Sequence, residues 1–169
     1  MSGAGTPATV AAKRAKIAFT LHSYDHDPAA ASYGLEAATA LGLPPERVFK
    51  TLVASVDGIH SATPGIPAGT LAVAVVPVAS SLDLKALAAT AGGKRAAMAD
   101  QRDAERATGY VAGGISPLGQ KRRLPTYLDA SAETFETIHV SAGRRGLEIE
   151  LAPSDLLRLT SGTLAPLAR

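Results

Sequence analysis

Cysteine and tryptophan are both absent from this 169-residue sequence, which also has only four tyrosines and three phenylalanines. Without cysteine there is no disulfide framework, no thiolate metal site and no cysteine nucleophile. The longest strongly apolar run, residues 71–79, contains Pro77 and is too short to span a bilayer. The N-terminus lacks the basic and apolar regions of a signal peptide. We therefore expect a soluble, cytoplasmic protein.

The residues that are present are those of a single globular domain. Hydrophobic residues make up 46% of the chain and charged residues 19%, and the apolar ones are mostly aliphatic. The formal net charge of +2 is weak evidence for any partner, but three basic clusters lie in the second half, at 94–95, 121–123 and 144–145. Such clusters suit a phosphate backbone, and they are equally typical of solvated turns.

Strand and helix patterns alternate along the chain without strict βαβ regularity. This order predicts an α/β (mixed α+β) single domain with a curved, barrel-like mixed sheet flanked by helices. Disorder is expected for residues 1–5, a flexible loop for 59–69 and a tail for 161–169. Helices are expected at 6–18, 32–41, from Ser80–Ser81 to Gly92, at 101–108 and 153–159, with one turn at 131–135, and strands at 19–24, 48–56, 71–77, 96–99, 123–129, 137–141 and 147–151.

Lys50 stands out because of its place in the strand predicted for 48–56. Alternation puts it on the same face as Val48, Leu52 and Val56, which is the more apolar face. An ammonium is costly there unless it finds a partner or an anionic ligand. A lysine at a frayed strand start that extends to water is the alternative interpretation.

A glycine-rich segment, residues 113–119, is the second candidate. Paired Gly113 and Gly114 allow a sharp turn that points successive N–H groups at one spot, where a carbonyl, carboxylate or phosphate can bind. An ordinary tight connection between strands would have the same composition. The glycine and lysine spacings of nucleotide-binding motifs are missing.

Other polar residues give weaker indications. Glu148 and Glu150 alternate with apolar residues, which favours a solvated strand face. His22 and His26 lie on a strand and the loop after it, so they would not meet, and we expect no metal and no other cofactor. Ser116 and Ser141 lack the His and Asp pattern of a serine hydrolase.

Several of these segments together resemble the YbaK-type Cys-tRNA deacylases, which are related to an editing domain of bacterial prolyl-tRNA synthetases. The resemblance runs from about residue 6 to 159, so the expected editing domain spans 6–160. The matching segments are YDHDP at 24–28, VFKTL at 48–52, MAD at 98–100, TGYVAGGISPLGQKRRLP at 108–125 and VSAGRRGLEIEL at 140–151.

The resemblance implies one pocket and a role for particular residues. Lys50 matches the lysine on which these enzymes depend, and Glu148 stands where the family more often has Asp. The resemblance makes Lys50 the catalytic residue, and it implies substrate binding by Tyr24, Thr51, Gly113, Gly114, Ser116, Ser141 and Glu148.

The resemblance also implies an activity: removal of mischarged cysteine from tRNA(Pro), and from Cys-tRNA(Cys), with the substrate's own thiol as nucleophile. The implied partners are aminoacyl-tRNA and, transiently, prolyl-tRNA synthetase, with no membrane and no metal. An Ala-tRNA(Pro) deacylase of the same superfamily and a non-catalytic tRNA- or synthetase-binding module are the alternatives.

Overall fold

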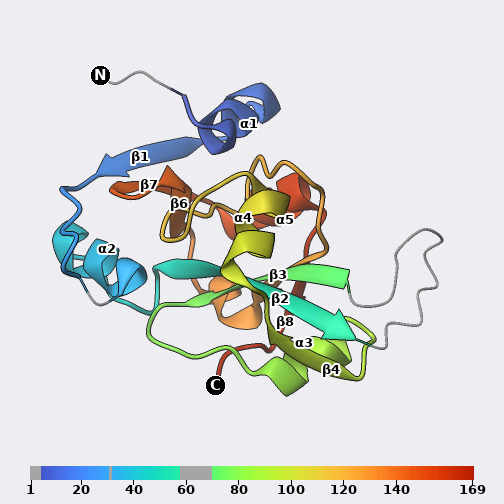
Figure 1. Cartoon of the computed structure of the whole chain (residues 1–169). Coiled ribbons are helices and arrows are strands. Elements are labelled where there is room, and N and C mark those ends of the chain that lie inside the picture. The colour runs from blue at the N-terminus through green and yellow to red at the C-terminus, as the bar shows by residue number, and fades with distance from the viewer. Residues whose placement is uncertain (1–4, 31, 58–69) are drawn as a thin grey trace.

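The computed structural model describes residues 5–30, 32–57 and 70–169 (Figure 1). The loop predicted at 59–69 and all but the last residue of the predicted disordered N-terminus lie outside these ranges. The described chain forms one mixed α/β domain of five α-helices, one 3₁₀-helix and eight strands. None of the helices in the described ranges is long and apolar enough to cross a membrane.

The strands form two sheets. Antiparallel β1, β7 and β6 make the smaller one, and the larger has the order β4-β2-β3-β5-β8. In the larger sheet β2 pairs antiparallel with β3 and β4, whereas β3–β5 and β5–β8 are parallel. The mixed sheet is as predicted, but the barrel-like form is wrong, because within the described residues neither sheet closes on itself.

The element bounds agree closely with the predicted ones. The helices are α1 (Pro7–Ala15), α2 (Tyr33–Leu41), α3 (Leu84–Thr90), α4 (Gln101–Thr108), η1 (Ala130–Thr134) and α5 (Pro153–Thr160). The strands are β1 (Phe19–Ser23), β2 (Phe49–Asp57), β3 (Thr70–Pro77), β4 (Arg95–Met98), β5 (Thr126–Asp129), β6 (Ile138–Arg144), β7 (Leu147–Leu151) and β8 (Thr163–Ala165).

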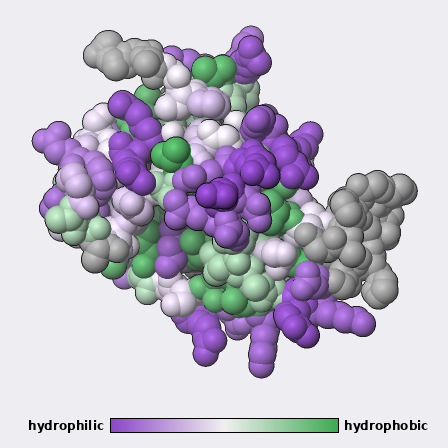
Figure 2. All heavy atoms as spheres, viewed as in Figure 1, coloured by the Kyte–Doolittle hydropathy of each residue, from purple (hydrophilic) through white to green (hydrophobic). Residues whose placement is uncertain are grey.

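Strand β3 is the centre of the core, as its continuous apolar run predicts. Val73 and Val75 pack on one face of the sheet with α1, α4 and the small sheet, and Ala74 and Val76 pack on the other with Leu87 of α3. α4 covers its side of the molecule with a strongly polar outer surface (Figures 1 and 2). The core is aliphatic, as the composition indicates.

Two local features differ from the sequence-based expectations. The cap of α3 is Asp83 and not Ser80–Ser81: the Asp83 carboxylate accepts a hydrogen bond from the Ala86 N–H at 3.1 Å. β8 forms within the segment expected to be a tail, and the Asp129 carboxylate holds the residues after it by accepting the Leu167 N–H at 2.8 Å. A three-residue strand has too little pattern to be recognised in the sequence.

The two sheets meet at the start of β2. Val48 forms an isolated parallel bridge with His139 of β6, and the His139 N–H donates to the Arg47 carbonyl at 3.2 Å. This junction sets the beginning of β2 beside the polar face of the small sheet, and α2 lies nearby (Figure 1).

Candidate functional site

A pocket of about 280 Å³ opens where β2, the small sheet, α2 and the glycine-rich loop converge. That volume is at the low end of small-molecule sites and suits a group of amino-acid size. The residues that line the pocket include most of those that the sequence singled out. The full lining is Tyr24, Ser32, Tyr33, Gly34, Phe49, Lys50, Thr51, Leu52, Gly113, Ile115, Ser141 and Glu148.

Lys50 is half-buried at the start of β2, and burial lowers the pKa of its ammonium. No carboxylate within the described residues forms an ion pair with it. The loss of hydration is therefore not offset by a protein counter-charge, and an electron-rich ligand in the pocket would take that place. The apolar strand face predicted for Lys50 is confirmed, since Ala54 and Val56 on that face are fully buried.

Glu148 lies in the pocket wall with only 6% of its surface exposed. Burial raises the pKa of its carboxyl to about 8, so the group is mostly protonated at neutral pH and can donate a hydrogen bond. The expectation of a solvated face for Glu148 and Glu150 is wrong. β7 is the central strand of its sheet, and Glu148 faces a pocket that the start of β2 and the start of α2 help to enclose.

Thr51 and Tyr24 add hydroxyl groups to the polar lining beside Lys50 and Glu148. The Thr51 hydroxyl oxygen is buried without a hydrogen-bond partner in the described part of the chain, so it is free for a ligand. Tyr24 follows β1, where its N–H donates to the Gly146 carbonyl at 3.0 Å. Burial, and secondarily the nearby Glu148, raise the pKa of the Tyr24 phenol, which is therefore a neutral hydrogen-bonding group.

The pocket rim is a stacked pair of side chains over Gly113. The Arg145 guanidinium lies 4.8 Å from the centre of the Tyr33 ring, and its Nε–H donates to the Ala112 carbonyl at 2.9 Å. Gly113 has a φ of +85°, and a Cβ there would lie 2.8 Å from Arg145 Nε and 2.9 Å from the Tyr33 ring. Glycine is needed both for the backbone conformation and for the close approach.

Alanine at Gly113 is expected to destabilise the protein by about 2–3 kcal/mol, from left-handed strain of about 1 kcal/mol and displacement of the Tyr33–Arg145 pair. Gly42→Ala is the matched control: its φ is +66°, but a Cβ there meets nothing within 4 Å. Urea unfolding of both variants measures the difference. Equal losses would mean that the contact with the stacked pair costs nothing.

Gly114 and Ser116 do not line the pocket. The Gly114 N–H already donates to the Val111 carbonyl at 2.9 Å, and a Cβ on Gly114 would lie only 2.8 Å from the Arg144 Cα. Ser116 is fully buried, and its hydroxyl accepts the Leu118 N–H at 3.2 Å. Both residues shape the loop, whereas Gly113 reaches the cavity and its N–H has no protein partner among the described residues.

Sequence reasoning did not identify Tyr33 and Arg145 as rim residues. Tyr33 is the first residue of α2, and its pattern predicts only a helix start. Arg145 is in the turn between β6 and β7, where a basic residue is ordinarily solvated. The one available signal was the long tract 140–151 of the family resemblance, which includes Arg145 without explaining it.

Comparison with known proteins places these features in a family. The aminoacyl-tRNA editing domain family matches residues 27–159. A protein of Enterococcus faecalis named “Putative Cys-tRNA(Pro)/Cys-tRNA(Cys) deacylase EbsC” is 45% identical over 128 residues, which are 76% of this chain and 72% of that protein.

Solved structures share the fold at lower identity. One described as a “putative trans-editing enzyme for prolyl tRNA synthetase” has a TM-score of 0.77 at 22% identity, covering 100% of this chain and 99% of that one. A protein described as hypothetical has a TM-score of 0.81 at 19% identity, covering 97% and 100%. The family model covers most of the chain and the Enterococcus faecalis relative is 45% identical, so the chain belongs to the aminoacyl-tRNA editing domain family.

Proposed function

We propose that this protein is a trans-editing aminoacyl-tRNA deacylase that removes mischarged cysteine from tRNA(Pro), and also from Cys-tRNA(Cys). The observation that carries the proposal is Lys50, a half-buried ammonium in a pocket of amino-acid size, with no ion-pair partner among the residues that the structure describes. Membership of the editing family and the name of the Enterococcus faecalis relative support the substrate.

The ester that joins an amino acid to tRNA is already activated, so positioning and charge stabilisation are enough for catalysis. Lys50 donates to the ester carbonyl oxygen, where negative charge develops, and the free Gly113 N–H is the second donor. The other candidate donor, the Gly114 N–H, is bonded to Val111. Thr51, Ser141 and protonated Glu148 then hydrogen-bond the amino-acid part.

The nucleophile in this proposal is the thiol of the bound cysteine. Its sulfur attacks the carbonyl carbon, the bond from that carbon to the ribose oxygen breaks, and a cyclic thiolactone leaves. The thiol proton passes to the ribose oxygen, so tRNA is released with its hydroxyl restored. The protein itself contains no cysteine, which is consistent with a nucleophile supplied by the substrate.

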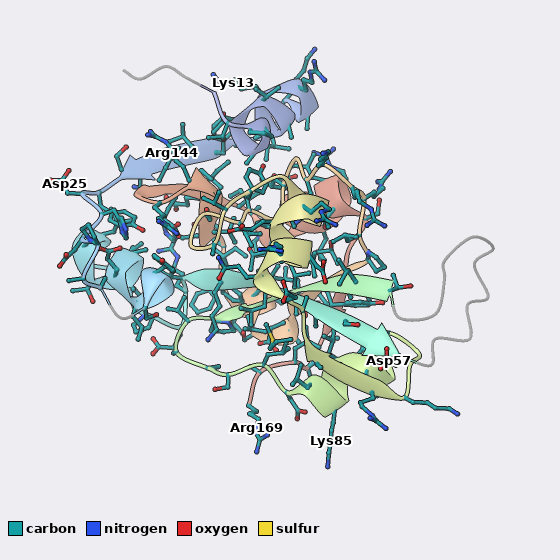
Figure 3. All side chains as sticks on the ribbon, in the orientation of Figure 1. Lys13, Asp25, Asp57, Lys85, Arg144 and Arg169 are labelled. Atoms are coloured by element: carbon teal, nitrogen blue, oxygen red, sulfur yellow. The ribbon has the colours of Figure 1, made fainter. Side chains whose placement is uncertain are left out.

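The tRNA part of the substrate would approach over the rim. Arg144 (labelled in Figure 3) and Arg145 are both exposed at the β6–β7 turn. Arg145 lies beside Gly113, which lines the pocket. Guanidinium groups in this place suit the phosphates of an acceptor end. We further propose that the protein works in the cytoplasm in transient association with prolyl-tRNA synthetase.

Deacylation of a panel of substrates tests this function. Cys-tRNA(Pro) is expected to be cleared at least about 100-fold faster than Ser-tRNA(Pro), which has the same shape but lacks the thiol. Pro-tRNA(Pro) is expected to remain intact. The measurement is the loss of radiolabelled amino acid from tRNA, with and without the synthetase.

Other outcomes separate the alternatives. Equal clearance of the serine and cysteine esters would exclude attack by the substrate thiol and indicate a water nucleophile. Preferential clearance of Ala-tRNA(Pro) would indicate the alanine-specific branch of the superfamily. Binding of tRNA without turnover of any ester would make the protein a non-catalytic binding module.

A further inference from the structure

A second polar cluster lies beside the pocket and has no part in the proposed reaction. His22 of β1, His139 of β6 and Glu150 of β7 each offer one ligand atom, and these atoms all lie within 4.8 Å of one another. Each residue is two positions from a pocket residue on the same strand or its end: Tyr24, Ser141 and Glu148. His22 lies directly opposite Glu148 in the sheet and His139 directly opposite Glu150, so the cluster adjoins the pocket residues on the polar face of the small sheet.

Sequence reasoning rejected a metal site because His22 and His26 would not meet, and the structure agrees on that pair. His26 bonds Glu36 at 2.8 Å, whereas His22 bonds Glu150 at 2.8 Å. The partner that completes a ligand set is His139, which is 117 positions further along the chain than His22 and reaches it only through sheet pairing.

His139 is the unusual member of the cluster. It is 1% exposed, and neither of its ring nitrogens has a hydrogen-bond partner in the described part of the chain. Buried polar nitrogens are normally paired, so an imidazole without a partner is costly unless it serves a ligand. Its ring lies 5.2 Å from that of His22, centre to centre, at an interplanar angle of 57°.

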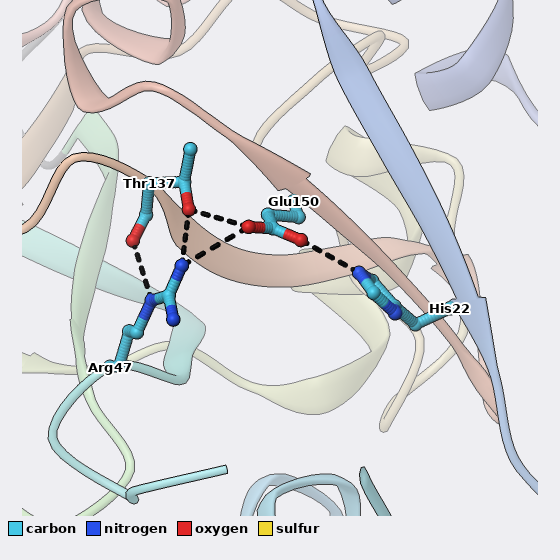
Figure 4. Close-up of polar contacts among 4 residues, drawn as sticks. All are labelled: His22, Arg47, Thr137 and Glu150. Carbon is cyan, nitrogen blue, oxygen red and sulfur yellow. Dashed lines mark hydrogen bonds and ion pairs between the residues drawn. The ribbon is translucent and has the colours of Figure 1, made fainter.

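Glu150 is held in an orientation suited to binding. One carboxylate oxygen, Oε2, accepts from the Thr137 hydroxyl at 2.6 Å and from Arg47 Nη2 at 3.1 Å, while Oε1 faces His22 Nε2 (Figure 4). Arg47 is itself fixed by the Thr137 carbonyl, which accepts its Nε–H at 2.9 Å. Such outer contacts on one oxygen leave the other free to ligate, as in many metal sites.

From this geometry we propose that His22, His139 and Glu150 bind one divalent transition-metal ion of the Zn²⁺ class. The ion replaces the direct contact between His22 Nε2 and Glu150 Oε1 and gives His139 its missing partner. Two imidazoles and one carboxylate form a known zinc ligand set, with a fourth position for water. His22 has a side chain that is 32% exposed, which provides both the approach and the freedom to close to ligand distances of about 2.0–2.2 Å.

The Arg47 charge selects among cations. A guanidinium on the outer oxygen of Glu150 opposes any positive ion, so hard ions that depend on oxygen ligands, Mg²⁺ and Ca²⁺, gain too little from one carboxylate. An ion that bonds strongly to imidazole nitrogen overcomes this opposition. Bound there, it would link β1, β6 and β7 next to the pocket wall.

The test measures metal binding by the full chain, without a histidine tag and in the absence of tRNA. Calorimetric titration is expected to show one Zn²⁺ per chain, and Co²⁺ is expected to give the visible absorption bands of a tetrahedral complex. The thermal midpoint should rise with Zn²⁺ and not with Mg²⁺. These readouts do not depend on deacylation, so their failure would leave the proposed function untouched.

Variants assign the ligands. His22→Ala and Glu150→Gln are each expected to weaken Zn²⁺ binding at least tenfold, on the order of the loss seen even for outer-shell changes. His26→Ala is the matched control, since His26 has an equivalent bond to a glutamate but belongs to no three-ligand cluster among the described residues. His60→Ala controls for the fourth histidine, which lies outside the described residues.

The proposal is overturned by any of three results. Wild-type protein could show no stoichiometric Zn²⁺ binding; His22→Ala or Glu150→Gln could bind as tightly as wild type; or binding could be lost in His60→Ala or His26→Ala instead. His139 is not needed as a variant, because its burial makes misfolding a competing explanation of any loss.

Discussion

Replacing Lys50 with alanine or methionine is expected to lower kcat/KM for Cys-tRNA(Pro) by about 100-fold or more. Loss of one preorganised donor to a developing oxyanion costs a factor of 10² to 10³ in comparable acyl-transfer sites. Among the described residues, Lys50 is the only lysine that lines the pocket, and none of the ion pairs between these residues involves it. Methionine keeps most of the side-chain volume, so an equal loss in both variants would assign the effect to the ammonium.

Two controls show whether the loss comes from chemistry or from folding. Lys85→Ala removes an exposed lysine at the far end of the molecule (Figure 3) and should leave kcat/KM unchanged. The thermal midpoint of Lys50→Met should equal or exceed that of wild type, because the desolvated ammonium has no ion-pair partner in the described part of the chain whose loss would destabilise the fold. Wild-type activity in Lys50→Ala would refute the assigned role.

The second large effect concerns Glu148 and pH. Its ordinary pKa is 4.5 and burial raises it to about 8 in the folded protein. Between these values the unfolded chain has lost the proton while the folded chain keeps it, so stability falls as pH rises. Below pH 4.5 the effect vanishes, and above pH 8 it is complete. The full shift corresponds to roughly 5 kcal/mol, and water in the open pocket reduces the expected effect to about 2–3 kcal/mol.

Glu148→Gln keeps the shape and the neutral charge, so it should match wild type at pH 5 and exceed its free energy of unfolding by about 2–3 kcal/mol at pH 8.5. Denaturant unfolding across this range, with a chelator present, gives the comparison. Glu150→Gln is the control of opposite sign, since hydrogen bonds from Thr137 and His22 lower the pKa of Glu150. Wild-type and Glu148→Gln curves that stay parallel from pH 5 to 8.5 would contradict a raised pKa.

Much of the fold was predictable because its local signals are strong. Thr6–Pro7, Ser32 and Asp100 mark helix starts at the residues where the structure has them, since capping depends only on neighbours in sequence. The apolar run of β3 predicts a strand covered on both faces, and it is. The barrel-like sheet was wrong because closure depends on which edges pair, and no local pattern encodes that.

The candidate site was likewise predicted only in part. Lys50, Tyr24, Thr51, Gly113, Ser141 and Glu148 were identified from strand alternation and from motifs of the editing family, and they surround one pocket. Gly114 and Ser116 belong to the same motif but turn away, because one backbone N–H is already bonded and one hydroxyl is buried. Membership of a motif does not distinguish residues that stabilise a loop from residues of the loop that line the pocket.

By itself, the sequence determined the class of fold, the family and the pocket lysine, because these depend on patterns within short segments. Only the tertiary structure decided the protonation state of Glu148 and which residues lie next to His22. A strand face that looked solvated becomes the wall of a pocket that β2 and the start of α2 help to enclose, and burial raises the pKa of Glu148 to about 8. His139 and Glu150 are more than a hundred residues from His22 in the sequence and come close to it through strand pairing. The spacing of residues within short segments cannot predict such a contact.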